Sequence, residues 1–153
     1  MVREVADRDV KRALALVNAV FSEFVAVNYS EEGIRTFESY LQNKIQEVSA
    51  ELKSGHKKMW AYYQGDEIIG VIATRETAHI SLMFVEKSHQ RKGIARQMFR
   101  VVAEEIKKDK NAVQITVNSS PYAVKVYERL GFVKTQEQQE KDGIVYIPMR
   151  QPL

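Results

Sequence analysis

The spacing of apolar residues divides the chain into helical and extended segments. Apolar residues recur every three or four positions in three segments, as is typical of helices with one buried face, namely 10–24, 30–52 and 94–106. Other segments are continuously apolar or alternate with period two, which predicts strands at 58–63, 67–74, 79–86 and 113–117. A short strand is expected at 2–5, and a closing hairpin at 135–141 and 144–149.

Capping and turn residues mark where these segments begin and end. Asp7 or Asp9 is placed to cap the first helix, and Tyr29 or Ser30 begins the second after a loop at 27–33. Gly55 ends the second helix. Its apolar stripe comprises Ile34, Phe37, Leu41, Ile45, Val48 and Leu52. Gly65-Asp66 suits a type II′ hairpin turn, and Asp142-Gly143 the turn of the closing hairpin.

The order of these elements indicates the fold class. Strands and helices do not alternate strictly, so a doubly wound parallel sheet is not expected. A mixed, mostly antiparallel sheet with helices on its faces accommodates the whole order, which is an α/β (α+β) arrangement. The sequence contains no repeat, linker or low-complexity tract, so residues 1–153 are expected to form a single domain.

The segment Gln90–Ala95 connects a buried strand to an amphipathic helix. The first amide groups of a helix have no intrahelical partner and the helix dipole is positive there, so cations are unfavourable. Arg91, Lys92 and Arg96 nevertheless lie in or beside this turn. A multiply charged anion bound by the amides and the basic side chains resolves the conflict, and Gly93 lets the backbone approach it. The alternative is a basic helix start exposed to solvent.

Two motifs carry a resemblance to a known family. Gln90-x-x-Gly93-x-Ala95 matches the Q/R-x-x-G-x-G/A motif of the GCN5-related N-acetyltransferases (GNAT family), whose loop binds the pyrophosphate of acetyl-coenzyme A. The run from Ala123 to Phe132, A-x-x-x-Y-x-x-L-G-F, is similar to the motif that follows the fifth core strand of that family. Residues 58–132 therefore resemble the conserved core of the GNAT fold.

The second motif also has a purely structural interpretation. Ser120 is a good helix cap, Pro121 suits the first helical position and Gly131 ends the helix. On spacing alone, Tyr127 is a core tyrosine on the apolar stripe of this short helix. The resemblance instead makes Tyr127 the tyrosine that donates a proton to the departing thiolate.

The resemblance further implies a sheet splayed between its fourth and fifth strands, with acetyl-coenzyme A (acetyl-CoA) in the gap. It implies that Met83, Phe84 and Val85 offer backbone groups to the pantetheine arm. It implies that the pyrophosphate is held by Arg91, Lys92, Gly93, Ile94, Ala95 and Arg96. Ser120 stands where many members of the family have Asn, and it is expected to contact the cofactor.

The attacking amine must lose a proton, because an unperturbed alkyl amine has a pKa of about 10. The Glu that some relatives carry on strand five is replaced by Ile115. The Glu that others carry on strand four falls at His79, which is the candidate base. Glu76, Glu31 and Glu32 are weaker candidates, and a chain of water molecules without a dedicated base is an equal alternative.

In the GNAT fold the acceptor pocket is shaped largely by the first two helices and their loop, here residues 21–37, and by the final hairpin. Tyr29, Phe21, Phe37 and Trp60 are candidates for its aromatic walls. Glu31 and Glu32 either give the entrance a negative charge that attracts a cationic amine, or only stabilise the helix dipole.

Composition excludes several other classes of protein. The 153 residues contain no cysteine, so disulfides, thiolate metal sites and cysteine nucleophiles are excluded, and no metal site is expected. A net charge of +3 is too small to indicate nucleic acid, and no apolar run reaches the ~18 residues of a membrane span. With 44% hydrophobic and 28% charged residues, we expect a cytoplasmic globular protein, monomeric or homodimeric.

The expected function is transfer of the acetyl group of acetyl-CoA to a primary amine by direct attack in a ternary complex. The acceptor is a small molecule, a peptide N-terminus or a lysine side chain. The alternative is a non-catalytic acyl-CoA-binding module, acting as a sensor or regulating a partner. The intact Tyr127 favours the enzyme, and the missing acid on strand five favours the alternative.

Overall fold

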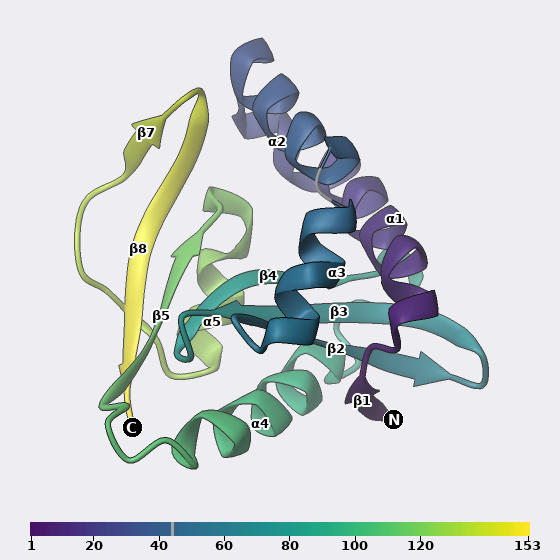
Figure 1. Cartoon of the computed structure of the whole chain (residues 1–153). Coiled ribbons are helices and arrows are strands. Elements are labelled where there is room, and N and C mark those ends of the chain that lie inside the picture. Colours follow the sequence, from purple (N-terminus) through teal and green to yellow (C-terminus); the bar gives the residue numbers. More distant parts are fainter. Residues whose placement is uncertain (44) are drawn as a thin grey trace.

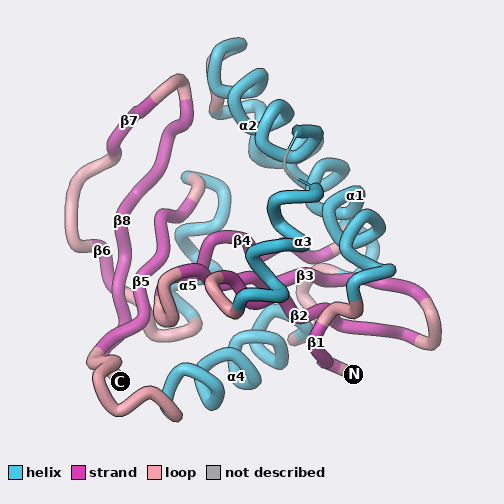
Figure 2. Tube along the Cα trace, viewed as in Figure 1, coloured by secondary structure: helices cyan, strands magenta, loops and turns pink. Residues whose placement is uncertain are grey.

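The computed structural model describes residues 1–43 and 45–153, without the side chains of Asn28 and residues 42–46. Its centre is a mixed sheet flanked by helices (Figures 1 and 2). In spatial order the strands are β1 (Val2–Glu4), β2 (Lys57–Gln64), β3 (Glu67–Arg75), β4 (His79–Val85), β5 (Gln114–Ser119), β8 (Ile144–Pro152) and β6 (Val133–Lys134), and β7 (Gln139–Lys141) pairs with β8. The helices are α1 (Val10–Val20), α2 (Glu31–Asn43), α3 (Ile45–Ser54), α4 (Ile94–Lys107) and α5 (Val124–Arg129).

The helices cover both faces of the sheet (Figure 1). On one face, α1 to α3 pack over a cluster that includes Val71 and Leu82. On the other face, α4 and α5 pack over a cluster that includes Ile72, Ile80 and Val117. Most buried apolar residues of the strands thus belong to one of two apolar layers, as the period-two spacing predicts.

The sheet opens between β4 and β5. These strands are parallel and pair only through His79 with Thr116 and Ile80 with Val117, although β4 continues to Val85. The register between β3 and β4 skips Ser81, so Ile80 and Leu82 contribute to opposite layers although they are two residues apart. The extra residue turns β4 where it leaves β5. The predicted mixed, mostly antiparallel sheet, splayed between its fourth and fifth strands and flanked by helices, is confirmed.

Some local expectations are wrong. Asp9 precedes α1 without capping it, because its carboxylate accepts hydrogen bonds from Arg12 Nη2 at 2.7 Å and from the Tyr63 hydroxyl at 2.9 Å. Residues 31–33, expected in a loop, form the first turn of α2, where the Gly33 N–H donates to Ser30 Oγ at 3.2 Å. The single helix expected over 30–52 is two helices, α2 and α3. Lys44 and the side chain of Ile45 lie outside the described residues.

The start of α2 packs against the turn of the β7–β8 hairpin through two glycines. A Cβ at either Gly33 or Gly143 would overlap the backbone of the other. Thr36 Oγ1 donates to the Asp142 carbonyl at 3.1 Å beside them. Asp142 and Gly143 have φ values of 53° and 78°, as the predicted tight hairpin turn requires. This contact holds the loop before α2 against the last hairpin (Figure 1).

Candidate active site

A cavity of about 650 Å³ lies where β4 and β5 separate. Its lining comes from both faces of the sheet. It includes Ser81–Val85 of β4, part of β5, the turn before α4, and α5. On the opposite face it includes residues between Val20 and Phe37. The volume is within the range of small-molecule sites. The opening in the sheet therefore joins two compartments into one site.

The turn before α4 has the geometry of an anion site. Gly93 caps the helix with φ 80°, and the first intrahelical bond runs from the Gln97 N–H to the Gly93 carbonyl at 3.0 Å. The amide groups of Ile94, Ala95 and Arg96 consequently have no acceptor within the helix. The first turn of α4 contains no acidic residue, and Arg91 is held at φ 63°. Free amides and the positive end of the dipole thus face the cavity.

Cations line two walls of the compartment on the α4–α5 side of the sheet. Arg91 and Arg96 line it from the α4 side, and Lys125 and Arg129 line it from α5. None of these side chains forms an ion pair with the described residues. Lys92 is exposed and is not in the lining. The motifs did not indicate Lys125 and Arg129, although their spacing of four places both on one side of α5.

The open edge of β4 offers backbone groups to a ligand. The Glu86 N–H donates to the Ile69 carbonyl of β3 at 2.9 Å. Because antiparallel strands direct their polar groups to alternate sides, Phe84 also faces β3, whereas Met83 and Val85 face the opening. In agreement, the Val85 carbonyl accepts a bond from Gln90 Nε2 at 3.0 Å. The outward-facing backbone groups of Met83 and Val85 are thus placed for a contact in the opening, and Phe84, whose backbone faces β3, also lines the cavity.

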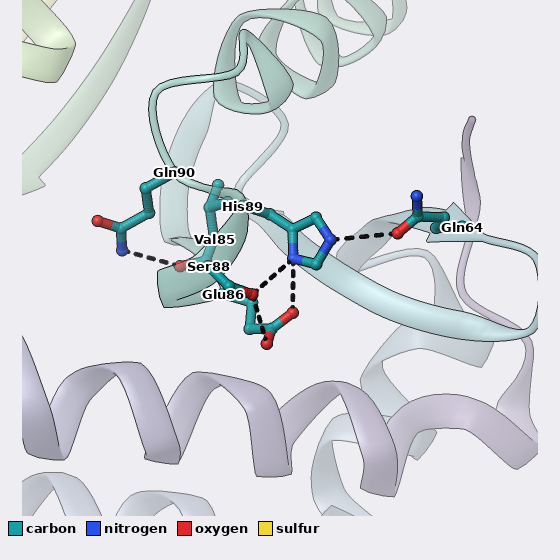
Figure 3. A network of polar contacts seen from close by, with 6 residues as sticks. All are labelled: Gln64, Val85, Glu86, Ser88, His89 and Gln90. Atoms are coloured by element: carbon teal, nitrogen blue, oxygen red, sulfur yellow. Dashed lines mark hydrogen bonds and ion pairs between the residues drawn. The ribbon is translucent and has the colours of Figure 1, made fainter.

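Polar contacts hold the turn that carries the basic residues (Figure 3). Gln90 bridges the opening, because it donates to Val85 and its Oε1 accepts from the Tyr122 hydroxyl at 3.0 Å. The Tyr122 ring stacks on Phe24, with ring centroids 5.2 Å apart. Beside Gln90, the His89 ring lies between Glu86 Oε2, at 2.8 Å, and Gln64 Oε1, at 3.1 Å (Figure 3). The position of the turn is thus fixed from β2, β4 and the segment before α5.

Tyr127 lines the cavity from α5 and is 5% exposed. Its ring meets the edge of Phe132 with centroids 5.5 Å apart, and its hydroxyl forms no hydrogen bond with the described residues. Burial raises the pKa of the Tyr127 hydroxyl well above its usual range, so the group remains a proton donor at neutral pH. Ser120 also lines the cavity, and its Oγ accepts from the Ala123 N–H at 3.2 Å, as a helix cap does.

The compartment on the α1–α2 face is aromatic. The Phe21 and Phe37 rings stack with centroids 4.0 Å apart, and Tyr29 meets the edge of Phe21 at 5.2 Å. All of them line the cavity, and burial raises the pKa of the Tyr29 hydroxyl. The final hairpin contributes no residue to the lining. The hairpin therefore supports the loop before α2 through Gly143 without forming a wall of the cavity.

His79 lies outside the cavity. It occupies the paired end of β4, where Nδ1 lies 2.8 Å from Thr116 Oγ1, whereas the strands open at the other end. Burial, together with the nearby charge of Arg75, lowers the pKa of His79. This position does not support the role of base that the sequence indicated.

The acidic and aromatic candidates outside the cavity have other environments. Glu31 and Glu32 are exposed on the first turn of α2, where Glu31 lies 3.9 Å from Arg35, and Glu76 is exposed in the turn before β4. Trp60, expected in an aromatic wall, is 4% exposed in the core on the α4 face of the sheet. The described residues of the lining include no carboxylate.

The part of the chain that the structure describes contains no group of three or more metal-ligating side chains. No helix within it is long and apolar enough to cross a membrane.

Comparisons with known proteins agree with this geometry. A family model described as the acetyltransferase (GNAT) domain matches residues 25–153. The fold resembles a solved GCN5-related N-acetyltransferase structure from Rhodopseudomonas palustris, also titled "Aminotransferase, Class-II" (TM-score 0.82, 17% identity, covering 100% of this chain and 95% of the other). It also resembles the PaiA N-acetyltransferase of Thermoplasma acidophilum in complex with coenzyme A (0.76, 16%, 100% and 98%). A spermidine N-acetyltransferase chimera from Vibrio cholerae is a further match (0.70, 17%, 99% and 94%). No curated protein sequence matches the chain.

Proposed function

Because the chain belongs to the GNAT family of acetyltransferases, we propose that it transfers the acetyl group of acetyl-CoA to a primary amine in a ternary complex. The observation that carries the proposal is the division of one cavity into a basic and an aromatic compartment joined at the opening of the sheet. A cofactor with several phosphate charges suits the first compartment, and an organic acceptor suits the second.

In this proposal the cofactor binds along the α4–α5 side. The amides of Ile94 to Arg96 hold the pyrophosphate together with Arg91 and Arg96. The pantetheine arm extends β4 through the outward-facing groups of Met83 and Val85. Lys125 and Arg129 match the remaining phosphate charge on the opposite wall.

The chemistry requires one nucleophile and one proton donor. The lone pair of the neutral amine attacks the thioester carbonyl, and the tetrahedral intermediate collapses by breaking the C–S bond. The sulfur leaves with the bonding electrons as a thiolate, and the Tyr127 hydroxyl donates the proton that makes it a thiol. Tyr127 carries its proton at neutral pH, since burial raises its pKa. The amine loses its own proton to water, and a proton from water returns to the Tyr127 phenolate, so that the hydroxyl is restored for the next turnover.

The test is thiol release by the purified protein in the presence of acetyl-CoA and a panel of primary amines, with mass spectrometry of the products. The proposal requires equal amounts of free coenzyme A and acetylated amine. Binding of acetyl-CoA with no amine-dependent thiol release would support the non-catalytic acyl-CoA-binding module instead. Absence of acetyl-CoA binding would reject both functions.

A further inference from the structure

The charges of the cavity are confined to one compartment. Every lysine and arginine in the lining belongs to the turn before α4, to α4 itself or to α5. The α1–α2 compartment is lined by Val20, Phe21, Val25, Tyr29, Phe37 and Phe84, none of which carries a charge at neutral pH. Its described residues therefore provide no counter-ion for a cationic acceptor.

The aromatic rings do not form an open cage for a cation. Such a cage requires exposed ring faces, whereas Phe21 and Phe37 cover each other at 4.0 Å with an interplanar angle of 22°. Tyr29 approaches Phe21 edge-on at 71°. Phe21 is fully buried, and burial alone raises the pKa of Tyr29, so the compartment is of low polarity. These rings suit an apolar body rather than an ammonium group.

The acids that could attract a second ammonium lie elsewhere. Glu31 and Glu32 are exposed on α2 and are absent from the lining. A diamine or polyamine whose distal ammonium stays inside the cavity would bring it either against the stacked rings or toward the guanidinium groups of Arg91 and Arg96. Both positions are unfavourable, the first by desolvation and the second by repulsion.

From these observations we propose that the acceptor is a primary monoamine on an apolar, preferably aromatic, body without a second positive charge. The inference rests on the acetyltransferase function proposed above and specifies its substrate class. It also accounts for a cavity whose described residues include no carboxylate base, because an apolar compartment lowers the pKa of a bound amine and favours its neutral, nucleophilic form. The acid limb of the pH–rate profile then follows the pKa of the acceptor.

A matched pair of amines tests the inference. Hexylamine and 1,6-diaminohexane have the same carbon chain and differ by one terminal ammonium. With saturating acetyl-CoA, kcat/KM for hexylamine is expected to exceed that for 1,6-diaminohexane at least ~10-fold, which is about 1.4 kcal/mol. Phenethylamine is expected to be at least as good as hexylamine. Equal or better turnover of the diamine, or of spermidine, would overturn the inference.

A charge placed in the compartment should reverse the preference. Tyr29→Asp introduces a carboxylate into the aromatic wall, so it should lower kcat/KM for hexylamine and raise it for the diamine. Val27→Asp is the matched control, because Val27 belongs to the same loop but is 76% exposed and lies outside the lining. An unchanged preference in a folded Tyr29→Asp variant would count against the inference.

Failure of the inference and failure of the proposed function give different results. Calorimetry first establishes whether the wild-type protein binds coenzyme A, and then titrates hexylamine into that complex. Coenzyme A binding together with turnover of other primary amines, but without binding or turnover of hexylamine, would overturn the substrate class alone. If neither coenzyme A binding nor thiol release is detected, the acetyltransferase function itself is wrong.

Discussion

Replacement of Tyr127 by phenylalanine separates the proposed proton donor from the packing of the fold. The ring is 5% exposed and packs against Phe132, and Tyr127→Phe preserves this contact. The hydroxyl has no hydrogen-bond partner among the described residues, so its removal leaves no buried group unsatisfied. The free energy of unfolding should therefore change by less than about 1 kcal/mol.

The effect on turnover should be much larger. Loss of a positioned proton donor typically costs about 10²–10⁴-fold in rate, which corresponds to roughly 3–5 kcal/mol of transition-state stabilisation. Because Tyr127 acts on the leaving thiolate, kcat should fall while the Kd of acetyl-CoA stays within about twofold. The contrast between a small change in stability and a large change in rate identifies a chemical role.

The assay combines steady-state thiol release, thermal unfolding and calorimetry with acetyl-CoA. Tyr62→Phe is the matched control, because it removes a hydroxyl from a half-buried tyrosine outside the cavity lining, and it should leave kcat unchanged. Wild-type turnover in Tyr127→Phe, with single-turnover kinetics showing that chemistry limits the rate, would refute the assignment of Tyr127.

Three further predictions concern the phosphate site, the α5 wall of the cavity and His79. Gly93→Glu should reduce acetyl-CoA affinity at least ~100-fold by calorimetry, because a carboxylate would stand at the free amides and Gly93 has φ 80°; unchanged affinity would reject the phosphate site. Arg129→Gln should weaken coenzyme A binding several-fold and flatten its salt dependence, whereas Arg100→Gln, outside the lining, should do neither. Burial lowers the pKa of His79 in the folded protein below its unfolded value of ~6.5, so the folded protein resists protonation of this side chain. The free energy of unfolding should therefore be unaffected by His79 above that pH and should fall as the pH drops below it. His79→Gln should make the melting temperature less dependent on pH between about pH 7 and 5 and leave the pH–rate profile unaltered. A profile that changes with activity would restore His79 as the base.

For the acidic pair on α2, Glu31 and Glu32, we predict an effect on stability and none on substrate binding. Because Glu31 and Glu32 lie outside the lining, the double change to glutamine should lower the melting temperature slightly, through the helix dipole, and leave both KM values unchanged. A higher KM for the amine that disappears at high salt would show that these carboxylates steer the substrate.

The parts of the site that the sequence predicts are those formed by consecutive residues. Gly93, its basic neighbours and the helix that follows lie within one turn, so their spacing determines their geometry. Tyr127 lies in α5, which follows a 3-10 turn (Pro121–Ala123) capped by Ser120 and ends just before Gly131, whose φ is 104°. For such segments, the residue types and their spacing are sufficient to predict the local structure.

The positions that the sequence did not predict correctly depend on how segments far apart in the chain pack together. His79 is on the correct strand, but the bulge at Ser81 opens β4 at the other end. Trp60 lies in a strand that was predicted from period-two spacing, and this spacing does not indicate which face of the sheet the residue occupies. Lys125 and Arg129 become significant only because α5 folds opposite the turn before α4. Glu31 and Glu32 had two interpretations, and their exposure on the first turn of α2, outside the lining, favours the helix-dipole one.

The central claim is that coenzyme A binds in the opening between β4 and β5. Hydrogen exchange followed by mass spectrometry, with and without coenzyme A, tests it most directly. We expect slower exchange in peptides covering residues 83–96 and 122–130, whose amides line or border the cavity, and unchanged exchange in residues 133–141. Protection confined to residues 133–141, or its absence at 83–96 under saturating coenzyme A, would contradict the account.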